Sequence, residues 1–426
     1  MLTCLTMLRG LNLWTRKPLT ALWLMLIGGL ASNACLKSLD ESLLDANAGA
    51  GAGGDAGAGG SAASAGSGGS GGNATGGADA GQDAAADASS DATADADASV
   101  EISVTPWDSG AFPSTNITGG AAGALISVDG SHVYFAEEAA LAQLIKRRAL
   151  AGGGNEPVSG STVDNVSALL APAGNLFLYA GVGIAATQDG QLVRFEKAPS
   201  PTNPPVAVPY ASKIGKISGM TVLQDPTKPR LVVVAKTSTA GQPHVLAANL
   251  AGGASALELV YTDPDGNQTG GPIAVDKNCV YWLSNGRAFA VSLAGGTRVS
   301  ALTSQISDAT GLTKDASHIY VARANGEIWQ RKAFGSACDG AGPPETRVLE
   351  GFPGASELVS YADRIAFLAS SSALGEGGVF SHALGSATVE QAVPASEMPE
   401  RLEHSGTSLI YRTSAGIIKQ APDGRQ

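Results

Sequence analysis

The sequence predicts an all-β protein, a β-propeller of seven four-stranded blades closed by an N-terminal strand. The first observation is a phrase that recurs seven times: an apolar strand, a polar turn and a second apolar strand. The second is its period, because the phrase centres run from residue 134 to residue 410 in six steps, an average of 46 residues. Such a period with several short strands per unit is typical of propellers. The third is composition, since 56 Gly and only 15% charged residues favour a turn-rich β protein. The centres are Tyr134, Phe177, Val232, Tyr281, Tyr320, Ala366 and Ile410.

The first 34 residues are interpreted as an export signal. Arg9, Arg16 and Lys17 form a basic flank, and 18–30 is a mostly apolar core of 13 residues. This core is too short to span a bilayer comfortably. Small residues follow it and lead to Cys35.

The end of this segment, Ser32-Asn33-Ala34-Cys35, resembles a bacterial lipoprotein signal, in which the cysteine after the cut carries the lipid. The resemblance implies that Cys35 is lipidated, that 35–45 is the anchored start of the mature chain, and that the protein lies in the bacterial cell envelope, on the outer membrane or its periplasmic side. Ser32 stands where such signals usually have Leu. The small-x-small pattern equally suits an ordinary signal peptidase, and the protein is then secreted.

Residues 46–100 are expected to form a disordered tether. The segment is almost entirely Ala, Gly, Ser and Asp and contains no aromatic residue. It cannot bury enough apolar surface to offset its chain entropy. As a flexible coil it would span about 40 Å.

Strands can be assigned within the units of the propeller, which we expect to occupy 101–426. The first unit reads ALISVD, HVYFAE, LIKRRAL and EPVSG from the inner strand to the rim. The last unit ends after its third strand, whereas EISVTPW (101–107) precedes the first unit without a blade of its own. We therefore predict that 101–107 supplies the outer strand of the seventh blade, because an open ring would leave strand edges unpaired. Six blades are the main alternative, since the second and third units are the least regular.

The phrases VYWLS and IYVAR resemble the YWTD and TolB-like propeller families. The full Tyr-Trp-Thr-Asp motif is absent, because Leu283 and Ser284 stand where Thr and Asp would be. The resemblance covers about 101–426 and implies an architecture. Signal, tether and propeller together are similar to bacterial envelope lipoproteins.

Three aspartates recur between the first and second strands of their units, and they read as turn residues. Asp129, Asp276 and Asp315 precede the second strand, where a carboxylate can bond nearby backbone. The histidines show no metal-ligand spacing, and no Cys-x-x-Cys pair is present. We expect no catalytic constellation, no metal and no cofactor.

Cys279 and Cys338 are expected to form a disulfide. Cys279 opens a second strand, and Cys338 lies between the third and fourth strands of the next unit. Both positions belong to the bottom face of adjacent blades, and an exported protein meets an oxidising compartment. Two reduced thiols are the alternative.

The opposite, top face carries the connections from second to third strands and from each blade to the next. Its candidate ligand-binding residues are Trp107, Glu137, Glu138, Asp263, Asp265, Arg287 and Arg323. The spacing of Asp263 and Asp265 is compatible with a cation loop, but Gly266 comes too early and Ala274 replaces the closing Glu. A plain turn explains the pair better.

Two functions follow from this organisation. The first is a noncatalytic, membrane-tethered binding or scaffold protein that recognises a protein, peptide or glycan through its top-face loops. The second is a propeller enzyme, a lyase or hydrolase, with an acid/base site at the central channel; the sequence favours the first because no such group of side chains is evident. Nucleic acid is an unsuitable partner, because the net charge is −11 and the longest basic run is Lys146-Arg147-Arg148.

Overall fold

The protein was analysed as a computed structural model. It describes residues 102–108, 114–118, 122–137, 142–183, 190–198, 202–208, 214–236, 243–250, 256–263, 270–302, 306–335, 338–339 and 344–424. Residues Thr93–Gln426 form one compact unit. The predicted signal, Cys35 and the predicted tether lie outside the described residues.

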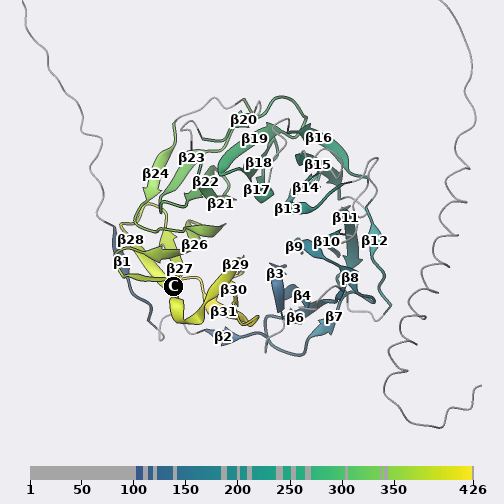
Figure 1. Cartoon of the computed structure of the whole chain (residues 1–426), viewed down its shortest axis with the longest axis horizontal. Helices are drawn as coiled ribbons and strands as arrows, with labels where there is room; N and C mark the ends of the chain where they lie inside the picture. Colours follow the sequence, from purple (N-terminus) through teal and green to yellow (C-terminus); the bar gives the residue numbers. More distant parts are fainter. Residues whose placement is uncertain are drawn as a thin grey trace, which may run out of the picture. The chain divides into compact units, whose positions relative to one another are not determined.

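Seven antiparallel sheets stand side by side around a common centre, which confirms the seven-bladed propeller (Figure 1). Blade 1 contains β3 (Ala122–Val128), β4 (His132–Glu137), β6 (Ile145–Ala149) and β7 (Glu156–Pro157). Blade 2 contains β9 (Val166–Leu170), β10 (Phe177–Gly183), β11 (Gly190–Glu196) and β12 (Val206–Ala207). Blade 3 contains β13 (Ile217–Leu223), β14 (Arg230–Lys236), β15 (Pro243–Asn249) and β16 (Glu258–Thr262). Blade 4 contains β17 (Gly270–Val275), β18 (Cys279–Ser284), β19 (Arg287–Ser292) and β20 (Val299–Ser300).

The remaining blades complete the ring. Blade 5 contains β21 (Ala309–Lys314), β22 (His318–Arg323), β23 (Ile328–Lys332) and β24 (Thr346–Leu349). Blade 6 contains β25 (Ser356–Tyr361), β26 (Arg364–Ser371), β27 (Glu376–Ala383) and β28 (Thr388–Pro394), with β1 (Ser103–Thr105) as a fifth strand. Blade 7 contains β29 (Pro399–Ser405), β30 (Ser408–Thr413), β31 (Ile418–Pro422) and β2 (Thr115–Asn116). A short pair, β5 (Ala142–Gln143) with β8 (Val163–Asp164), lies between blades 1 and 2.

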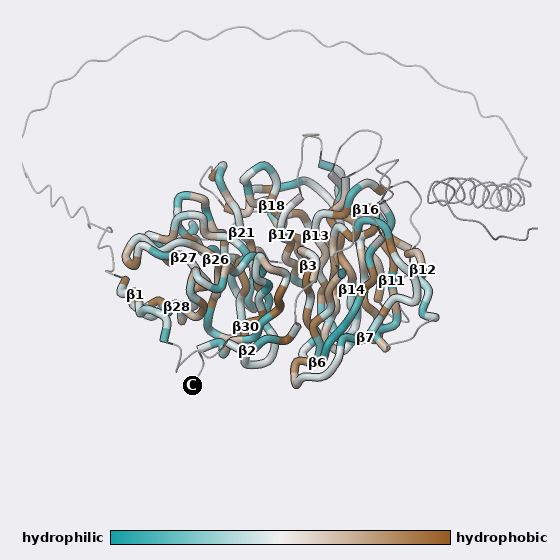
Figure 2. The backbone as a smooth tube through the Cα atoms, turned by 60° about the horizontal axis from the view of Figure 1, so that its bottom comes forward, coloured by the Kyte–Doolittle hydropathy of each residue, from teal (hydrophilic) through white to brown (hydrophobic). Residues whose placement is uncertain are grey.

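The hydrophobic core lies between the blades. Seven clusters of buried side chains occur among the described residues, one for each pair of neighbouring blades. The second strand of each blade is covered on both faces, so it reads as a continuous apolar run; every residue of β18 is buried. Hydrophobic stretches follow the strands, and many connections are hydrophilic (Figure 2). The phrase found in the sequence is therefore the buried centre of each blade.

Every inner strand carries a β-bulge near its start, where the pairing register with the second strand shifts. In two blades a hydroxyl stabilises the bulge, because Ser167 and Ser218 each donate to a carbonyl of the second strand. The equivalent Thr310 hydroxyl of blade 5 lies closest to the carbonyl of Ala355. Bulges re-aim side chains at the rims of β structures. Here they lie beside residues that line the central cavity, among them Ser167, Ser218 and Glu357.

The ring is closed by an N-terminal strand, but the strand is β2 and not 101–107. Thr115 and Asn116 pair with Gln420 and Lys419 of β31, and the backbone N–H of Ile418 donates to the Thr118 hydroxyl at 2.9 Å. The predicted closing segment contains β1, which pairs in parallel with β28 of blade 6. The prediction for 101–107 is thus wrong.

Connection length explains the correction. Only residues 117–121 separate β2 from the inner strand of blade 1. This connection is as short as those expected between an outer strand and the next blade. A closing strand at β1 would have required a much longer connection, because 106–121 follow it.

Candidate functional site

Among the described residues, the charged side chains predicted on the top face do not converge in one site. Each forms an ion pair within its own blade or with the next blade, or stands exposed. The Nζ of Lys146 donates to Glu137 at 2.7 Å across blade 1. In blade 5, Arg323 donates to Asp308 at 2.8 Å and also contacts Glu327. Arg287 is exposed at the start of β19 in blade 4.

Two further predicted residues form hydrogen bonds to neighbouring parts of the ring, and two lie outside the described residues. The backbone N–H of Trp107 donates to the side chain of Gln391 in blade 6 at 3.1 Å. The Asp263 side chain is 2% exposed and accepts a hydrogen bond from Arg298 of blade 4 at 2.6 Å. Asp263 therefore links blades 3 and 4. Asp265 and Glu138 lie outside the described residues.

The recurrent aspartates are turn residues, as expected. In each turn one carboxylate oxygen accepts backbone N–H groups two and three residues ahead: Ser131 and His132, Asn278 and Cys279, Ser317 and His318. The other oxygen accepts the hydroxyl of a tyrosine five residues ahead, Tyr134, Tyr281 or Tyr320. One aspartate carboxylate therefore accepts hydrogen bonds from both the backbone N–H groups of the turn and the hydroxyl of a buried tyrosine.

These turns also connect neighbouring blades. Lys197, which follows β11 in blade 2, donates to Asp129 of blade 1 at 3.0 Å. Burial acts to raise the pKa of Asp129, but hydrogen bonds from Tyr134, Lys197 and the backbone outweigh it and lower the pKa. Asp129 consequently remains a carboxylate acceptor, which suits a structural role rather than proton transfer.

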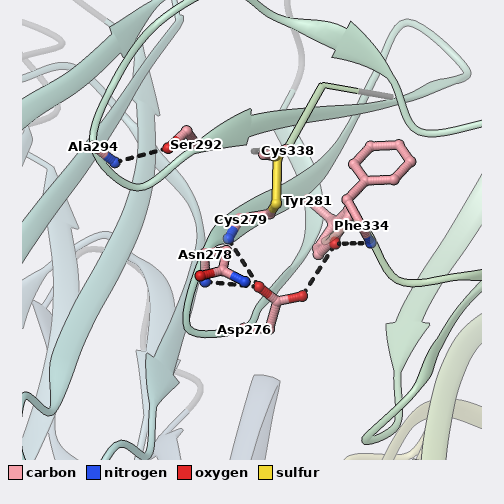
Figure 3. Close-up of a disulfide and its surroundings, with 8 residues drawn as sticks. All are labelled: Asp276, Asn278, Cys279, Tyr281, Ser292, Ala294, Phe334 and Cys338. Atoms are coloured by element: carbon pink, nitrogen blue, oxygen red, sulfur yellow. Dashed lines mark hydrogen bonds between the residues drawn. A yellow bond between two sulfur atoms is a disulfide. The ribbon is translucent and has the colours of Figure 1, made fainter. Parts of the chain in front are cut away.

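The two cysteines meet at the bottom of blades 4 and 5. Cys279 and Cys338 are joined by a disulfide with a Cα–Cα distance of 5.8 Å, and both side chains are buried (Figure 3). The adjacent Tyr281 hydroxyl donates to Asp276 at 3.0 Å and accepts from the backbone N–H of Phe334 at 2.9 Å. Covalent and hydrogen-bonded links thus join the same two blades.

Side chains from five blades meet in the central channel, in a cavity of about 330 Å³. Its walls come from β3, β9, β13, β25 and β29 and from the residue before β13. Aliphatic side chains alternate there with charged and hydroxyl groups. The charged and hydroxyl residues are Ser167, Lys216, Ser218, Glu357, Arg401 and Glu403.

Two acids and one arginine dominate the electrostatics of this cavity. Arg401 of blade 7 forms an ion pair with Glu357 of blade 6. Burial raises the pKa of Glu357, although Arg401 and the backbone N–H of Leu402 act to lower it. For Glu403, burial and the nearby charge of Glu357 raise the pKa to about 8, against the opposing effect of Arg401. At neutral pH the carboxyl group of Glu403 is therefore mostly protonated.

The sequence predictions did not include this group of residues. Glu357, Arg401 and Glu403 lie on inner strands, whereas the predictions named residues of loops and strand ends. A signal was present, because Arg401 and Glu403 alternate with Leu402 in a strand that was predicted to line the channel. Glu357 was harder to predict, because it lies in the bulge with a backbone φ of 47°, where the regular alternation of side chains along the strand is interrupted.

The described residues contain neither a cluster placed to hold a metal ion nor a helix that could span a bilayer. Among them, no group of three or more His, Cys, Asp or Glu side chains is placed to hold a metal ion. Within that same part of the chain, no helix has the length and hydrophobicity required to cross a bilayer.

Comparison with known proteins identifies the fold and no family. No protein-family model and no curated protein sequence matches the chain. Many solved structures share its architecture. A chain of the mitotic checkpoint complex superposes with a TM-score of 0.50 and 12% identity, covering 72% of this chain and 92% of that one. The tricorn protease superposes with a TM-score of 0.50 and 10% identity, over 75% of this chain and 34% of that one. The likeness is one of fold alone.

Proposed function

We propose that this protein is a noncatalytic binding protein of the bacterial cell envelope, held at a membrane through a lipid on Cys35. Its ring recognises a protein, peptide or glycan at the top face and the mouth of the central channel. The tether of 46–100 separates the ring from the anchor. This proposal joins the sequence of the first 100 residues to the architecture of the remainder.

The observation that supports binding through the channel is the distribution of charged side chains. The described top-face side chains form separate ion pairs, within one blade or between two, or stand exposed. Glu357, Arg401 and Glu403 instead bring three ionisable groups from two blades into one cavity. Ligand sites are concave, with a few polar groups set among apolar walls. The channel cavity fits this description better than any of the loops named from the sequence.

A second function is favoured by one observation. A carboxyl group with a pKa of about 8 beside a second carboxylate is suited to general acid–base catalysis near neutral pH. A lyase or hydrolase would use Glu403 and Glu357 as its acid/base pair. We rank this function second because no His, Cys or Tyr occurs among the described residues that line the cavity, so the pair has no such nucleophile or third group there.

The anchor is tested by metabolic labelling with a clickable fatty acid. Wild type should carry the label and sediment with membranes, whereas Cys35→Ser should lose the label and remain soluble. Unlabelled wild type in the culture medium would instead identify a secreted protein.

Binding is tested by photo-crosslinking from two exposed lysines on opposite faces. Lys216 lies at the channel, and Lys277 lies in a bottom-face turn of blade 4. Each is replaced in the full-length protein by p-benzoylphenylalanine, and intact cells are irradiated. A recurrent cross-linked species is expected from position 216 and not from 277, and the ligand should be recovered chemically unchanged. Equal products at both positions would contradict binding at the channel, and a converted ligand would favour the enzyme.

A further inference from the structure

Two hydroxyl groups beside the channel cavity donate their protons to backbone carbonyls and keep acceptor capacity. The Ser167 hydroxyl donates its proton to the carbonyl of Gly181 at 3.3 Å. The Ser218 hydroxyl donates to the carbonyl of Val234 at 3.1 Å. With their protons committed to the bulges, both oxygens offer lone pairs to the cavity.

Among the described residues that line this cavity, Glu403 is the acid for which no ion pair is found. Arg401 is engaged with Glu357, and the factors that set the pKa of Glu403 include no hydrogen bond. The residue is half-buried beside the cavity, and burial is the largest factor that raises the pKa of its carboxyl group. A desolvated carboxylate of this kind is unfavourable until a cation or a proton neutralises it.

We propose that the channel cavity binds a primary ammonium group, that of a lysine side chain on a peptide or protein ligand, with the Glu403 carboxylate as its counter-ion. The inference rests on the proposed binding function and names its ligand class. An ammonium has three N–H donors and no acceptor. One carboxylate and the oxygens of Ser167 and Ser218 supply three matching acceptors.

Other ligand chemistries fit this set of groups less well. A divalent metal ion requires more oxygen or nitrogen ligands than two carboxylates, and no metal-binding group of three occurs among the described residues. An anion would meet Lys216 at the wall but also two acids, and the second cation, Arg401, is already paired with one of them. The aliphatic side chains of Leu125, Leu169 and Met220 complete the lining and match the methylene chain of a lysine.

Binding of an ammonium should release a proton from Glu403. The groups that face Glu403 are Glu357 and Arg401, with Lys216 also on the cavity. The lining segments of β3 and β9 add no charge. Because the pKa of Glu403 is about 8, the cation replaces a bound proton below that pH. Apparent affinity should rise about tenfold per pH unit from pH 6 toward 8 and then level off.

The test uses the full-length protein with ¹³C-methyl methionine and n-butylamine as the probe. Met220 lines the cavity, and Met398 is 55% exposed on a connection between blades 6 and 7 and serves as the internal control. Butylamine should shift the methyl signal of Met220 and leave that of Met398 in place. Butyrate and n-butanol, which lack the ammonium, should shift neither.

Variants separate the role of Glu403 from a general charge effect. Glu403→Gln should abolish the response to butylamine, whereas Glu376→Gln, an equal charge change at an exposed site of β27, should retain it. Lys216→Gln removes a like charge from the cavity and should strengthen binding about two- to fivefold. Because Lys216 is exposed, Lys216→Gln should fold even if Glu403→Gln does not, and its affinity for butylamine still tests the proposal.

The inference is overturned if Glu403→Gln and wild type respond equally, if Lys216→Gln leaves the affinity unchanged, if butyrate gives the response, or if affinity is independent of pH. Failure here is distinguishable from failure of the binding function. If butylamine has no effect while Lys216-directed cross-linking still captures a ligand, the ligand class is wrong and the binding function stands. If both are negative, the binding function falls as well.

Discussion

Asp276 and Tyr281 show how a single pair of side chains stabilises a turn, a strand and a contact between blades. The carboxylate holds the turn through two backbone N–H groups and accepts the tyrosine hydroxyl. The same hydroxyl accepts the backbone N–H of Phe334 in the next blade. Asp315 and Tyr320 form the same pair, and no contact from the next blade to that hydroxyl was found among the described residues. The two pairs therefore differ in one interaction.

We expect Tyr281→Phe to destabilise the protein more than Tyr320→Phe. Loss of the Tyr320 hydroxyl removes one hydrogen bond to a carboxylate, at a cost of about 1–2 kcal/mol. Loss of the Tyr281 hydroxyl also leaves the N–H of Phe334 without its acceptor, which raises the cost to about 2–3 kcal/mol. Urea unfolding of the two variants measures the difference. Equal losses would show that the contact with Phe334 contributes nothing.

Strand β2 is the element that completes blade 7 and closes the ring. Its two residues pair with β31, and the following Ile117 and Thr118 are buried. Strand β1 instead extends a blade that already has four strands, and Ile102 and Val104 are only partly buried against it. Loss of β2 would therefore expose buried residues and the edge of β31, whereas loss of β1 would expose only partly buried side chains.

Stepwise shortening of the chain should reveal this difference. A protein that begins at residue 114 loses β1 and should lose about 1–2 kcal/mol of stability, from partly buried apolar area. A protein that begins at 122 also loses β2, exposes the edge of β31 and should lose at least about 3 kcal/mol and self-associate. Thermal unfolding and size-exclusion chromatography report both effects. The larger loss at the first step would restore 101–107 as the closing segment.

The disulfide between blades 4 and 5 should stabilise the ring. It closes a segment with a sequence separation of 59 residues, for which loop-closure entropy corresponds to about 4 kcal/mol. Reductant should lower the unfolding midpoint of wild type and leave the Cys279→Ala/Cys338→Ala variant unaffected. If reductant leaves the unfolding midpoint of wild type unchanged, the two thiols are not paired.

The closed ring places inner strands of several blades close enough to share one cavity. Glu357 and Glu403 come from adjacent blades, and the pKa of Glu403 depends on both burial and that neighbour. In the unfolded chain neither effect operates. The folded protein therefore holds a proton that the unfolded chain releases at lower pH, and stability falls as the pH rises.

We expect the free energy of unfolding to decrease between pH 6 and 9. The pKa of Glu403 is raised from 4.5 to about 8. The protonated carboxyl group therefore contributes its full share of the free energy of unfolding below pH 4.5, and this share is lost as the pH rises through 8. Over the measured window the loss is about 2–3 kcal/mol. Glu403→Gln cannot ionise, so its stability should remain flatter over this window. Parallel pH profiles for the two proteins would contradict the assignment.

The sequence by itself determined the repeat and the identity of the buried strands, and it favoured seven blades over six. These follow from local alternation and from a period that each unit carries independently, as the second strands around Tyr134, Tyr281 and Tyr320 illustrate. The aspartate turns were predictable for the same reason, because their hydrogen bonds span only a few residues.

Tertiary structure decided which N-terminal strand closes the ring and which charged residues meet at its centre. The contact between Thr118 and Ile418 spans 300 residues, and no local pattern encodes it. Glu357 and Arg401 come together only because a bulge and the packing of two blades aim their side chains at one another. Interactions within a strand or turn can be predicted from sequence spacing, whereas contacts between blades depend on the geometry of the whole ring.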